Sequence, residues 1–133
     1  CFVRQVPEFG NACGTIGCLH VCLNIEHWIS SNSPMQSFRD KTIACTPEER
    51  GKILISIKEL KSQSDISAES SQAQTVCPPR DADDLDHHFV GFVSSKGHLF
   101  ELDGTKYSPI DHGTTSPKTF ADDVWHIIKS NFI

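Results

Sequence analysis

The chain has 133 residues, of which 38% are apolar, and this length predicts a single domain. No apolar run approaches the roughly 18 residues that a membrane-spanning helix needs, so we expect no membrane partner. The 12 basic and 17 acidic residues give a net charge of −5. That balance argues against a nucleic-acid partner, which needs clustered lysine and arginine, and is compatible with a basic protein partner.

The cysteines allow two interpretations. On count alone they permit three disulfides, among Cys1, Cys13, Cys18, Cys22, Cys45 and Cys77. They are sparse for a chain of this length, however, and the opening residues lack the basic and long apolar segments of a secretion signal. We therefore predict thiols in a reducing compartment, the cytoplasm, rather than a disulfide framework.

The first third of the chain predicts a short strand and a buried helix. Residues 1–9 are typical of a strand entering a loop, and Pro7 argues against regular structure at that point. Residues 13–29 carry apolar side chains around most of a helical surface, as expected of a buried helix. The serine-rich run 30–34 then ends this helix.

A second helix is indicated by its capping residues. Thr46 suits the N-cap, Pro47 suits the first helical position, and Glu49 completes a capping box. Apolar spacing extends this helix to about Ser62. Residues 63–87 are rich in Ser, Gln, Asp and Pro, and a loop of this length in a compact domain is typically a functional lid or disordered.

The last third of the chain predicts a β-hairpin and a helix. Two strand-like runs, 87–95 and 98–104, are joined through Lys96-Gly97. After a polar loop, Ser116-Pro117 starts a last helix. Its apolar face consists of Phe120, Val124, Ile127 and Ile128. The whole pattern indicates an α+β domain in which an antiparallel sheet packs against helices.

Cys13 is the first candidate for chemistry, because it lies where the buried helix is expected to begin. A helix start directs backbone N–H groups and the positive end of the helix dipole at a thiol, which favours the nucleophilic thiolate. Gly14 and Gly17 would keep the nearby backbone open to a substrate. The alternative is an inert, buried cysteine beside a glycine turn.

A metal site is the weaker interpretation of these cysteines. Cys13, Cys18 and Cys22 contain no Cys-x-x-Cys pair, and even with His20 nearby four converging zinc ligands are not visible. Cys18 and Cys22 fit core packing better. We therefore expect neither a metal ion nor another cofactor.

The predicted hairpin supplies a base and a group to orient it, as a cysteine nucleophile requires. With a four-residue loop 94–97, His88 lies directly opposite Asp103, and opposed residues of an antiparallel pair share a face. With a two-residue loop 96–97, His88 is diagonal to Asp103 on the same face. A three-residue loop would break this relation unless a bulge restored it.

Other histidines are weaker candidates for the base. His87 points to the opposite face from Asp103, and His112 is expected in a loop. His98 and Asp111 have no comparable geometric argument. The sequence therefore predicts His88 and Asp103 as the functional pair.

These motifs together resemble those of the ubiquitin C-terminal hydrolases, papain-like cysteine peptidases that cleave after the C-terminal glycine of ubiquitin. "NACGTIG" is similar to the family's nucleophile motif, and "HFVGFV", "GHLFELDG" and "DHG" are similar to its His and Asp motifs. The spacings are similar too, with 75 positions from Cys13 to His88 and 15 from His88 to Asp103. The resemblance covers nearly all of the 133 residues.

The resemblance implies a papain-like fold, with an antiparallel sheet packed between helices and a long crossover loop at about 63–87. It also implies Cys13 as the nucleophile, His88 as the general base and then acid, and Asp103 as the residue that orients His88. The reaction would be deubiquitination, in which Cys13 attacks the carbonyl of ubiquitin's terminal glycine, a small or flexible adduct leaves, and water hydrolyses the thioester. The expected partner is then ubiquitin or a ubiquitin-like protein, and the expected state is a monomer.

The chain departs from this family in two respects. The family's oxyanion donor is a Gln six positions before the nucleophile, where this chain has Pro7. Gln5 lies eight positions before Cys13, so it can serve only if "VPEFG" contains a two-residue insertion. The family's N-terminal strand and helices, and a final strand, are not recognised within residues 1–133, so we expect a truncated catalytic domain that is poorly active alone.

The residues leave two other functions open. One is a ubiquitin-binding relative whose catalysis is impaired by Pro7 and by truncation. The other is a different papain-like enzyme, such as an acyl transferase with the same triad. Cleavage of a ubiquitin substrate separates the first interpretation from both.

Overall fold

The computed structural model describes residues 1–9, 13–25, 27, 29–57 and 89–133. Its helices are α1 (Cys13–Leu23), α2 (Pro34–Thr42), α3 (Pro47–Ser56) and α5 (Phe120–Asn131), with a short 3₁₀-helix η1 (Pro7–Phe9). Its strands are β1 (Gly91–Ser95), β2 (His98–Leu102) and β3 (Ile110–Thr114), which form an antiparallel sheet in the order β1-β2-β3. Within these residues no helix is long and apolar enough to cross a membrane.

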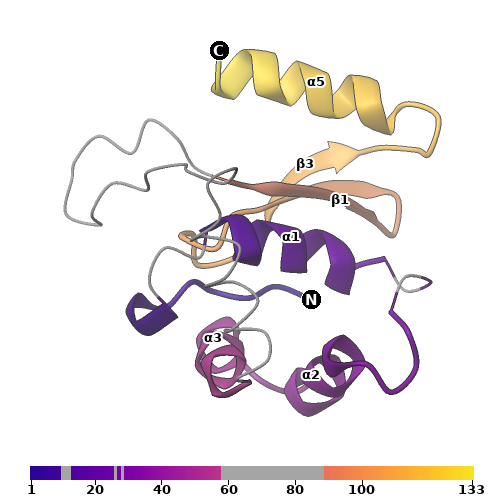
Figure 1. Cartoon of the computed structure of the whole chain (residues 1–133). Coiled ribbons are helices and arrows are strands. Elements are labelled where there is room, and N and C mark those ends of the chain that lie inside the picture. Colours follow the sequence, from indigo (N-terminus) through magenta and orange to yellow (C-terminus); the bar gives the residue numbers. More distant parts are fainter. Residues whose placement is uncertain (10–12, 26, 28, 58–88) are drawn as a thin grey trace, which may run out of the picture.

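The sheet lies between α1 on one side and α5 on the other (Figure 1). Helices α2 and α3 lie on the far side of α1 from the sheet, and the N-terminal segment, residues 1–6, passes between α1 and α3. The predicted α+β architecture, with an antiparallel sheet packed between helices, is therefore confirmed.

Two apolar clusters hold these layers together. The larger cluster joins the N-terminal segment to α1, α2 and α3, and consists of Val3, Val6, Ile16, Leu19, Leu23, Phe38 and Leu54. The smaller cluster joins the sheet to α1 and consists of Phe2, Val93 and Leu102, with Val21 and Phe100 packed against them. Because α1 contributes to both clusters, it is buried from two sides, as the sequence predicts.

Helix α1 begins at Cys13 as predicted but ends at Leu23, so the prediction that it extends to residue 29 is wrong. The reason is tertiary: the Asn24 side chain donates to the carbonyls of His20 at 2.6 Å and Cys1 at 2.7 Å. The Asn24 N–H meanwhile closes a tighter turn onto Val21 O. An asparagine that binds backbone groups in this way competes with continuation of the helix.

Two elements between residues 7 and 42 differ from the expectation. Pro7 begins the 3₁₀-helix η1, so the prediction of no regular structure there is wrong; proline suits a first helical position because its missing N–H has no helical partner. Helix α2 was not predicted. Ser33 caps it by accepting from the Gln36 N–H, and Pro34 occupies its first turn. The serine-rich run that is predicted only to end the preceding helix therefore starts another one.

Helix α3 confirms the predicted capping box. The Thr46 hydroxyl accepts from the Glu49 N–H, and the Glu49 carboxylate accepts from the Thr46 N–H. The helix ends at Ser56 rather than near Ser62, because Ile57 adopts an extended conformation. Residues 58–88, which contain the predicted crossover loop, lie outside the described residues.

The hairpin is confirmed with a two-residue turn. Ser95 pairs with His98, so Lys96 and Gly97 form the loop and the four-residue alternative is wrong. Both turn residues have positive φ, 51° and 77°, as a type I′ turn requires. The strand begins at Gly91 and not at the predicted start, 87, which lies outside the described residues.

The C-terminal region contains a strand that the sequence analysis missed. Strand β3 lies within the predicted polar loop. Its side chains are exposed or half-buried, because β3 is an edge strand of the sheet. The last helix begins at Phe120 rather than at Ser116-Pro117, since Ser116 and Thr119 first form a hydrogen-bonded turn. The four residues of its predicted apolar face are all half-buried.

Gly51 marks the closest approach of α3 to the N-terminal segment, and we expect Gly51→Ala to destabilise the fold. An added Cβ would lie 2.3 Å from Arg4 O and 2.9 Å from Val6 Cγ1. This clash outweighs the helix-propensity gain of about 1 kcal/mol, so urea titration should show a net loss of about 1–3 kcal/mol in the free energy of unfolding. Gly17→Ala is the matched control, because its nearest neighbour would be Phe89 Cβ at an ordinary 3.5 Å. Equal stability of the two variants would contradict this account.

Candidate active site

Cys13 is the first residue of α1 and is buried, with 7% of its surface exposed. The helix start directs backbone N–H groups and a partial positive charge towards this end of the molecule. Three segments that are distant in sequence pack against the first turns of α1. They are the N-terminal segment at Val6, the entry to β1 at Phe89, and the exit from β2 at Gly104.

The Gln5 backbone is fixed beside the end of β2. Its N–H donates to Gly104 O at 2.8 Å. A Cβ on Gly104 would lie 2.7 Å from Ile16 Cγ2 and 3.3 Å from Gln5 Cβ, so glycine permits this close approach. The 3₁₀-helix η1 lies between Gln5 and Cys13, within the segment where the expected two-residue insertion falls.

Charged side chains anchor the same N-terminal segment. Arg4 donates to the Glu48 carboxylate at 2.6 Å, and its guanidinium lies 4.0 Å from the centre of the Tyr107 ring. This hydrogen bond from Arg4 holds the pKa of Glu48 below its ordinary value. Arg50 donates to Phe2 O at 3.0 Å. The residues around Gln5 are therefore tied to α3 and to the loop after β2.

Phe89 covers the face of α1 that carries two glycines. An added Cβ would lie 3.7 Å from the Phe89 ring at Gly14 and 3.5 Å from Phe89 Cβ at Gly17. The expectation that these glycines leave the backbone open is therefore wrong for the structure as described. The predicted base, His88, and its rival, His87, lie outside the described residues.

Asp103 directly follows β2 and is buried, with 5% of its surface exposed. Its Oδ1 accepts from the Thr105 N–H at 2.9 Å and from the Thr105 hydroxyl at 2.7 Å. Its backbone carbonyl accepts from the Lys106 N–H. These contacts fix the carboxylate rigidly beside Gly104, as a residue that orients another side chain must be fixed.

His20 is a fully buried histidine at the centre of this region. Its Nδ1 lies 3.1 Å from Leu102 O, and its Nε2 lies 3.1 Å from Val3 N and 2.9 Å from Val3 O. The neutral tautomer with the proton on Nδ1 satisfies two groups, since Nδ1–H donates to Leu102 O and Nε2 accepts from the Val3 N–H. The tautomer with the proton on Nε2 satisfies only one group, since Nε2–H donates to Val3 O while Nδ1 and Leu102 O face each other as two acceptors. The first tautomer brings two acceptors together at Val3 O but satisfies one group more, so we infer that it is the form present.

We expect His20 to make the fold acid-sensitive. Burial lowers the pKa of His20 from its ordinary value of 6.5, because the charged imidazolium loses its hydration. The unfolded chain therefore binds the proton more readily, so the stability contribution is complete above about pH 6.5 and is lost as pH falls from there towards the folded-state pKa. Thermal melts between pH 8 and 5 should show this loss, and His20→Gln should have a shallower dependence. Parallel pH profiles for the two proteins would contradict the assignment.

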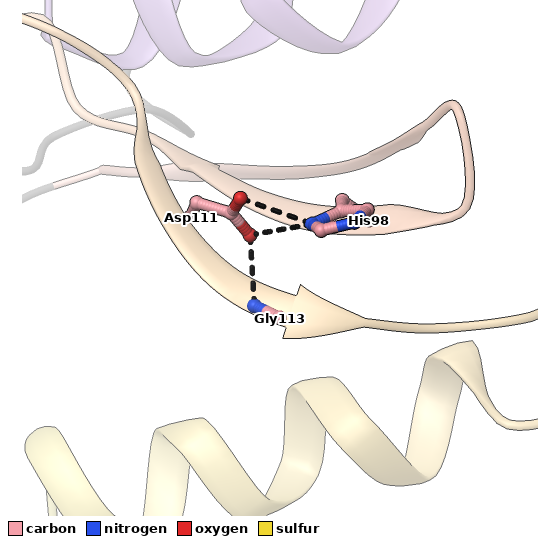
Figure 2. A network of polar contacts seen from close by, with 3 residues as sticks. All are labelled: His98, Asp111 and Gly113. Carbon is pink, nitrogen blue, oxygen red and sulfur yellow. Dashed lines mark hydrogen bonds and ion pairs between the residues drawn. The ribbon is translucent and has the colours of Figure 1, made fainter.

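The structure brings together a histidine and a carboxylate that the sequence analysis did not pair. His98 Nδ1 lies 3.1 and 3.0 Å from Oδ1 and Oδ2 of Asp111, and Oδ1 also accepts from the Gly113 N–H at 2.8 Å (Figure 2). Two hydrogen bonds hold the pKa of Asp111 below its ordinary value. The bond from the Gly113 N–H has the larger effect, and the bond from His98 has the smaller one. Both side chains are about half exposed.

This pair is remote from the cysteine helix start. His98 begins β2 and Asp103 follows its end, and the five residues of that strand place them about 16 Å apart. The register of β3 shifts between His98 and Phe100, so that His98 pairs with Thr114 while Asp111 pairs with Phe100, two residues further along β2. The pairing could not be anticipated because it depends on a strand that the polar sequence did not indicate.

His112 also lies in β3 and not in a loop, so that prediction is wrong. Its Nε2 donates to the Glu101 carboxylate at 2.8 Å on the α5 side of the sheet. The centres of the His112 and Phe92 rings lie 6.3 Å apart. Both partners are largely buried. This contact ties the edge strand to β2 and has a structural role.

The described cysteines carry no disulfide among themselves, which agrees with the predicted thiols; they are Cys1, Cys13, Cys18, Cys22 and Cys45. Cys18 is exposed, so the core-packing expectation is wrong for that residue. Cys22 is half-buried, and Cys77 lies outside the described residues.

The geometry defines an α+β domain in which a cysteine begins a helix that packs against an antiparallel sheet, with a fixed carboxylate at the end of the central strand. The family model described as "Ubiquitin carboxyl-terminal hydrolase, family 1" matches residues 1–132. The chain therefore belongs to the ubiquitin carboxyl-terminal hydrolase family, as the sequence motifs predict.

Curated relatives agree with this assignment. The chain is 38% identical over 130 residues to a probable ubiquitin carboxyl-terminal hydrolase of Dictyostelium discoideum, a match that covers 96% of this chain and 49% of the relative. It is 36% identical over 128 residues to a ubiquitin carboxyl-terminal hydrolase of Drosophila melanogaster, covering 96% of this chain and 54% of the relative. The chain therefore spans about half the length of these relatives.

A solved structure supports the fold. The catalytic domain of UCH37 from Trichinella spiralis, bound to ubiquitin vinyl methyl ester, matches with a TM-score of 0.76 and 21% sequence identity. The match covers 98% of this chain and 55% of that chain. The arrangement of helices and sheet is thus that of a ubiquitin carboxyl-terminal hydrolase domain.

Proposed function

We propose that this protein is a deubiquitinating thiol hydrolase that releases small or flexible adducts from the C-terminal glycine of ubiquitin. Residues 1–133 act as one catalytic unit. Cys13 attacks the glycine carbonyl, His88 removes the thiol proton and then protonates the leaving group, and Asp103 orients His88. Water then hydrolyses the thioester. The reaction belongs in the cytoplasm, where thiols stay reduced.

One observation supports the proposal most strongly: the first turns of α1 are where the predicted catalytic segments meet. Phe89, the residue after the proposed base, packs against Gly14 and Gly17. The described chain therefore meets the helix that Cys13 begins at the residue that follows the proposed base in the sequence. Gly104, the residue after Asp103, packs against Ile16 on the same helix.

Ubiquitin is the proposed substrate because of the family and its relatives. The matching UCH37 domain is described as bound to ubiquitin vinyl methyl ester, a ubiquitin whose C-terminus carries an electrophile. A cysteine hydrolase with the same fold and the same nucleophile motif is expected to accept the same C-terminus. No metal or cofactor is needed for this acyl transfer.

Gln5 is the proposed oxyanion donor, and we expect Gln5→Ala to lower kcat by about 10²–10³-fold with little change in KM. The side-chain amide would donate to the charge that develops only in the transition state, so ground-state binding is spared. Gln36→Ala is the matched control, since the Gln36 side chain donates to the exposed Asp40 carboxylate on the surface of α2. Steady-state kinetics with a ubiquitin substrate measure both. Equal kcat for the two variants would remove Gln5 from the mechanism.

The function itself is tested by release of a fluorophore from the C-terminus of ubiquitin by the intact protein. A deubiquitinase releases it with saturation kinetics, and unlabelled ubiquitin inhibits competitively. Binding of ubiquitin without release would instead indicate a catalytically impaired relative. Failure to bind ubiquitin at all would overturn the proposal and favour another papain-like acyl transfer.

A further inference from the structure

His20 connects two segments of the proposed catalytic machinery that are far apart in the sequence. Its Nε2 accepts from the N–H of Val3, which is two residues before Gln5, and its Nδ1–H donates to the carbonyl of Leu102, which is directly before Asp103. The sequence separations are 17 and 82 residues. His20 itself lies seven positions after Cys13, two turns along the same helix.

The two segments also bind each other directly, which closes a ring. The Gln5 N–H donates to Gly104 O at 2.8 Å, so the chain passes from His20 through Val3, Gln5 and Gly104 back to Leu102. A ring closed by three hydrogen bonds fixes the placement of Gln5 relative to Asp103. Neither segment can shift along α1 without breaking a bond to a buried group.

The imidazole is held in one orientation. Its ring stacks on Phe2 with centroids 5.0 Å apart and planes 14° apart. The Asn24 amide donates to the His20 carbonyl at 2.6 Å and to the Cys1 carbonyl at 2.7 Å. These two bonds join the start of the N-terminal segment to α1 at His20. Because the side chain has no exposed surface, it does not touch substrate or exchange protons with water during the reaction.

We propose that His20 is a positioning residue that sets the oxyanion donor Gln5 and the orienting carboxylate Asp103 against the helix of Cys13. This role rests on the proposed function, since it requires both residues to act on the same reaction. An apolar side chain of equal size would fill the space but would remove the hydrogen bonds that His20 makes to the Val3 N–H and to the Leu102 carbonyl. Histidine is thus required because it has two hydrogen-bonding nitrogens. One binds Val3 (the Val3 arm) and the other binds Leu102 (the Leu102 arm).

Two amide variants separate the arms of His20. In His20→Asn the amide nitrogen lies near the Nδ1 position, so it retains the bond to Leu102 O and loses the bond to the Val3 N–H. In His20→Gln the amide oxygen reaches the Nε2 position and retains the bond to the Val3 N–H instead. Release of the Val3 arm moves Gln5, and release of the Leu102 arm moves Asp103.

The test combines kinetics with a double-mutant cycle in the intact protein, using ubiquitin that carries a C-terminal fluorophore. We expect His20→Asn to lower kcat by about 10–100-fold with KM changed less than about twofold, because small misplacements of catalytic groups are costly. In a Gln5→Ala background the same change should cost less than about threefold. His20→Gln should retain most of kcat. It should instead shift the pH profile of kcat/KM, because Asp103 orients the proposed base, His88, and this profile reports the protonation of the base.

Amide hydrogen exchange gives a readout that does not depend on activity. His20→Asn should accelerate exchange of the Gln5 N–H, which bonds Gly104 O, more than that of the Thr105 N–H, which bonds Asp103. His20→Gln should reverse this order. Thr42→Val is the stability control, because it removes a buried hydrogen bond to Phe38 O in α2 and should lower the melting temperature without changing kcat.

Equal fold-losses for His20→Asn in the wild-type and Gln5→Ala backgrounds, or uniform acceleration of both amides, would show a merely structural histidine and overturn the proposal. Should His20→Asn fold poorly, a cycle of His20→Gln against Asp103→Asn, measured as the shift in the pH profile of kcat/KM, decides the question. If the wild-type protein leaves ubiquitin substrate uncut, the proposed function fails and the positioning role falls with it. Additive losses in an active protein overturn the positioning role alone.

Discussion

Replacing Cys13 with alanine is expected to lower kcat for a ubiquitin substrate by about 10⁴-fold or more, because the acyl-enzyme can no longer form. Binding of ubiquitin should persist, since the loss concerns a single sulfur atom that is almost entirely buried. Fluorophore release and ubiquitin binding, measured on the same preparation, give the two values. Loss of both together would indicate a folding defect and not a missing nucleophile.

Cys18→Ala is the matched control for this variant. Cys18 lies on the same helix, five positions further along, and its side chain is exposed. The substitution removes a thiol of identical chemistry from a site that faces away from the converging segments. We expect kcat within about twofold of wild type. A large loss in Cys18→Ala would contradict the assignment of Cys13 as the reactive thiol.

The second large effect is expected at the base, where His88→Gln should lower kcat by about 10⁴-fold, comparable to loss of the nucleophile itself. Glutamine retains hydrogen-bonding capacity but cannot take up and return the thiol proton. The thiol of Cys13 then attacks only through the fraction that ionises in water. Rates between pH 6 and pH 10 should rise towards high pH in the variant, where hydroxide replaces the missing base.

His87→Gln is the control for the base, since it makes the same change one residue earlier. The sequence predicts that the two histidine side chains alternate between opposite faces of an extended segment, with His88 on the face of Asp103. We expect His87→Gln to retain kcat within about threefold. If the losses at His87 and His88 are exchanged, the register of the proposed triad is wrong by one residue.

Local signals were sufficient to predict several elements. The capping box at Thr46 and Glu49 fixes the start of α3 because its hydrogen bonds join residues three apart in sequence. The sequence also located the turn at Lys96-Gly97 but left the loop length, and with it the hairpin register, open until the pairing of Ser95 with His98 decided it. The end of α1 could not be predicted, because it depends on the hydrogen bond from the Asn24 side chain to the Cys1 carbonyl, 23 residues earlier.

Long-range contacts also explain what was missed. Strand β3 is polar and lies at the edge of the sheet, so hydrophobic alternation does not reveal it; it forms because β2 supplies hydrogen-bonding partners. The sequence marked Asp103 as a candidate, but its burial and its bonds to Thr105 emerge only in the fold. His20 was considered only as a weak metal ligand, since the backbone groups that it binds lie 17 and 82 residues away.

The central claim is that Cys13 is the nucleophile that attacks the C-terminus of ubiquitin, and covalent capture tests it most directly. The intact protein is incubated with ubiquitin vinyl methyl ester, digested, and the modified peptide is identified by mass spectrometry. The account predicts one ubiquitin per protein, attached through the sulfur of Cys13, and no adduct in Cys13→Ala. An adduct on Cys18 or another cysteine, or no adduct at saturating ubiquitin, would contradict it.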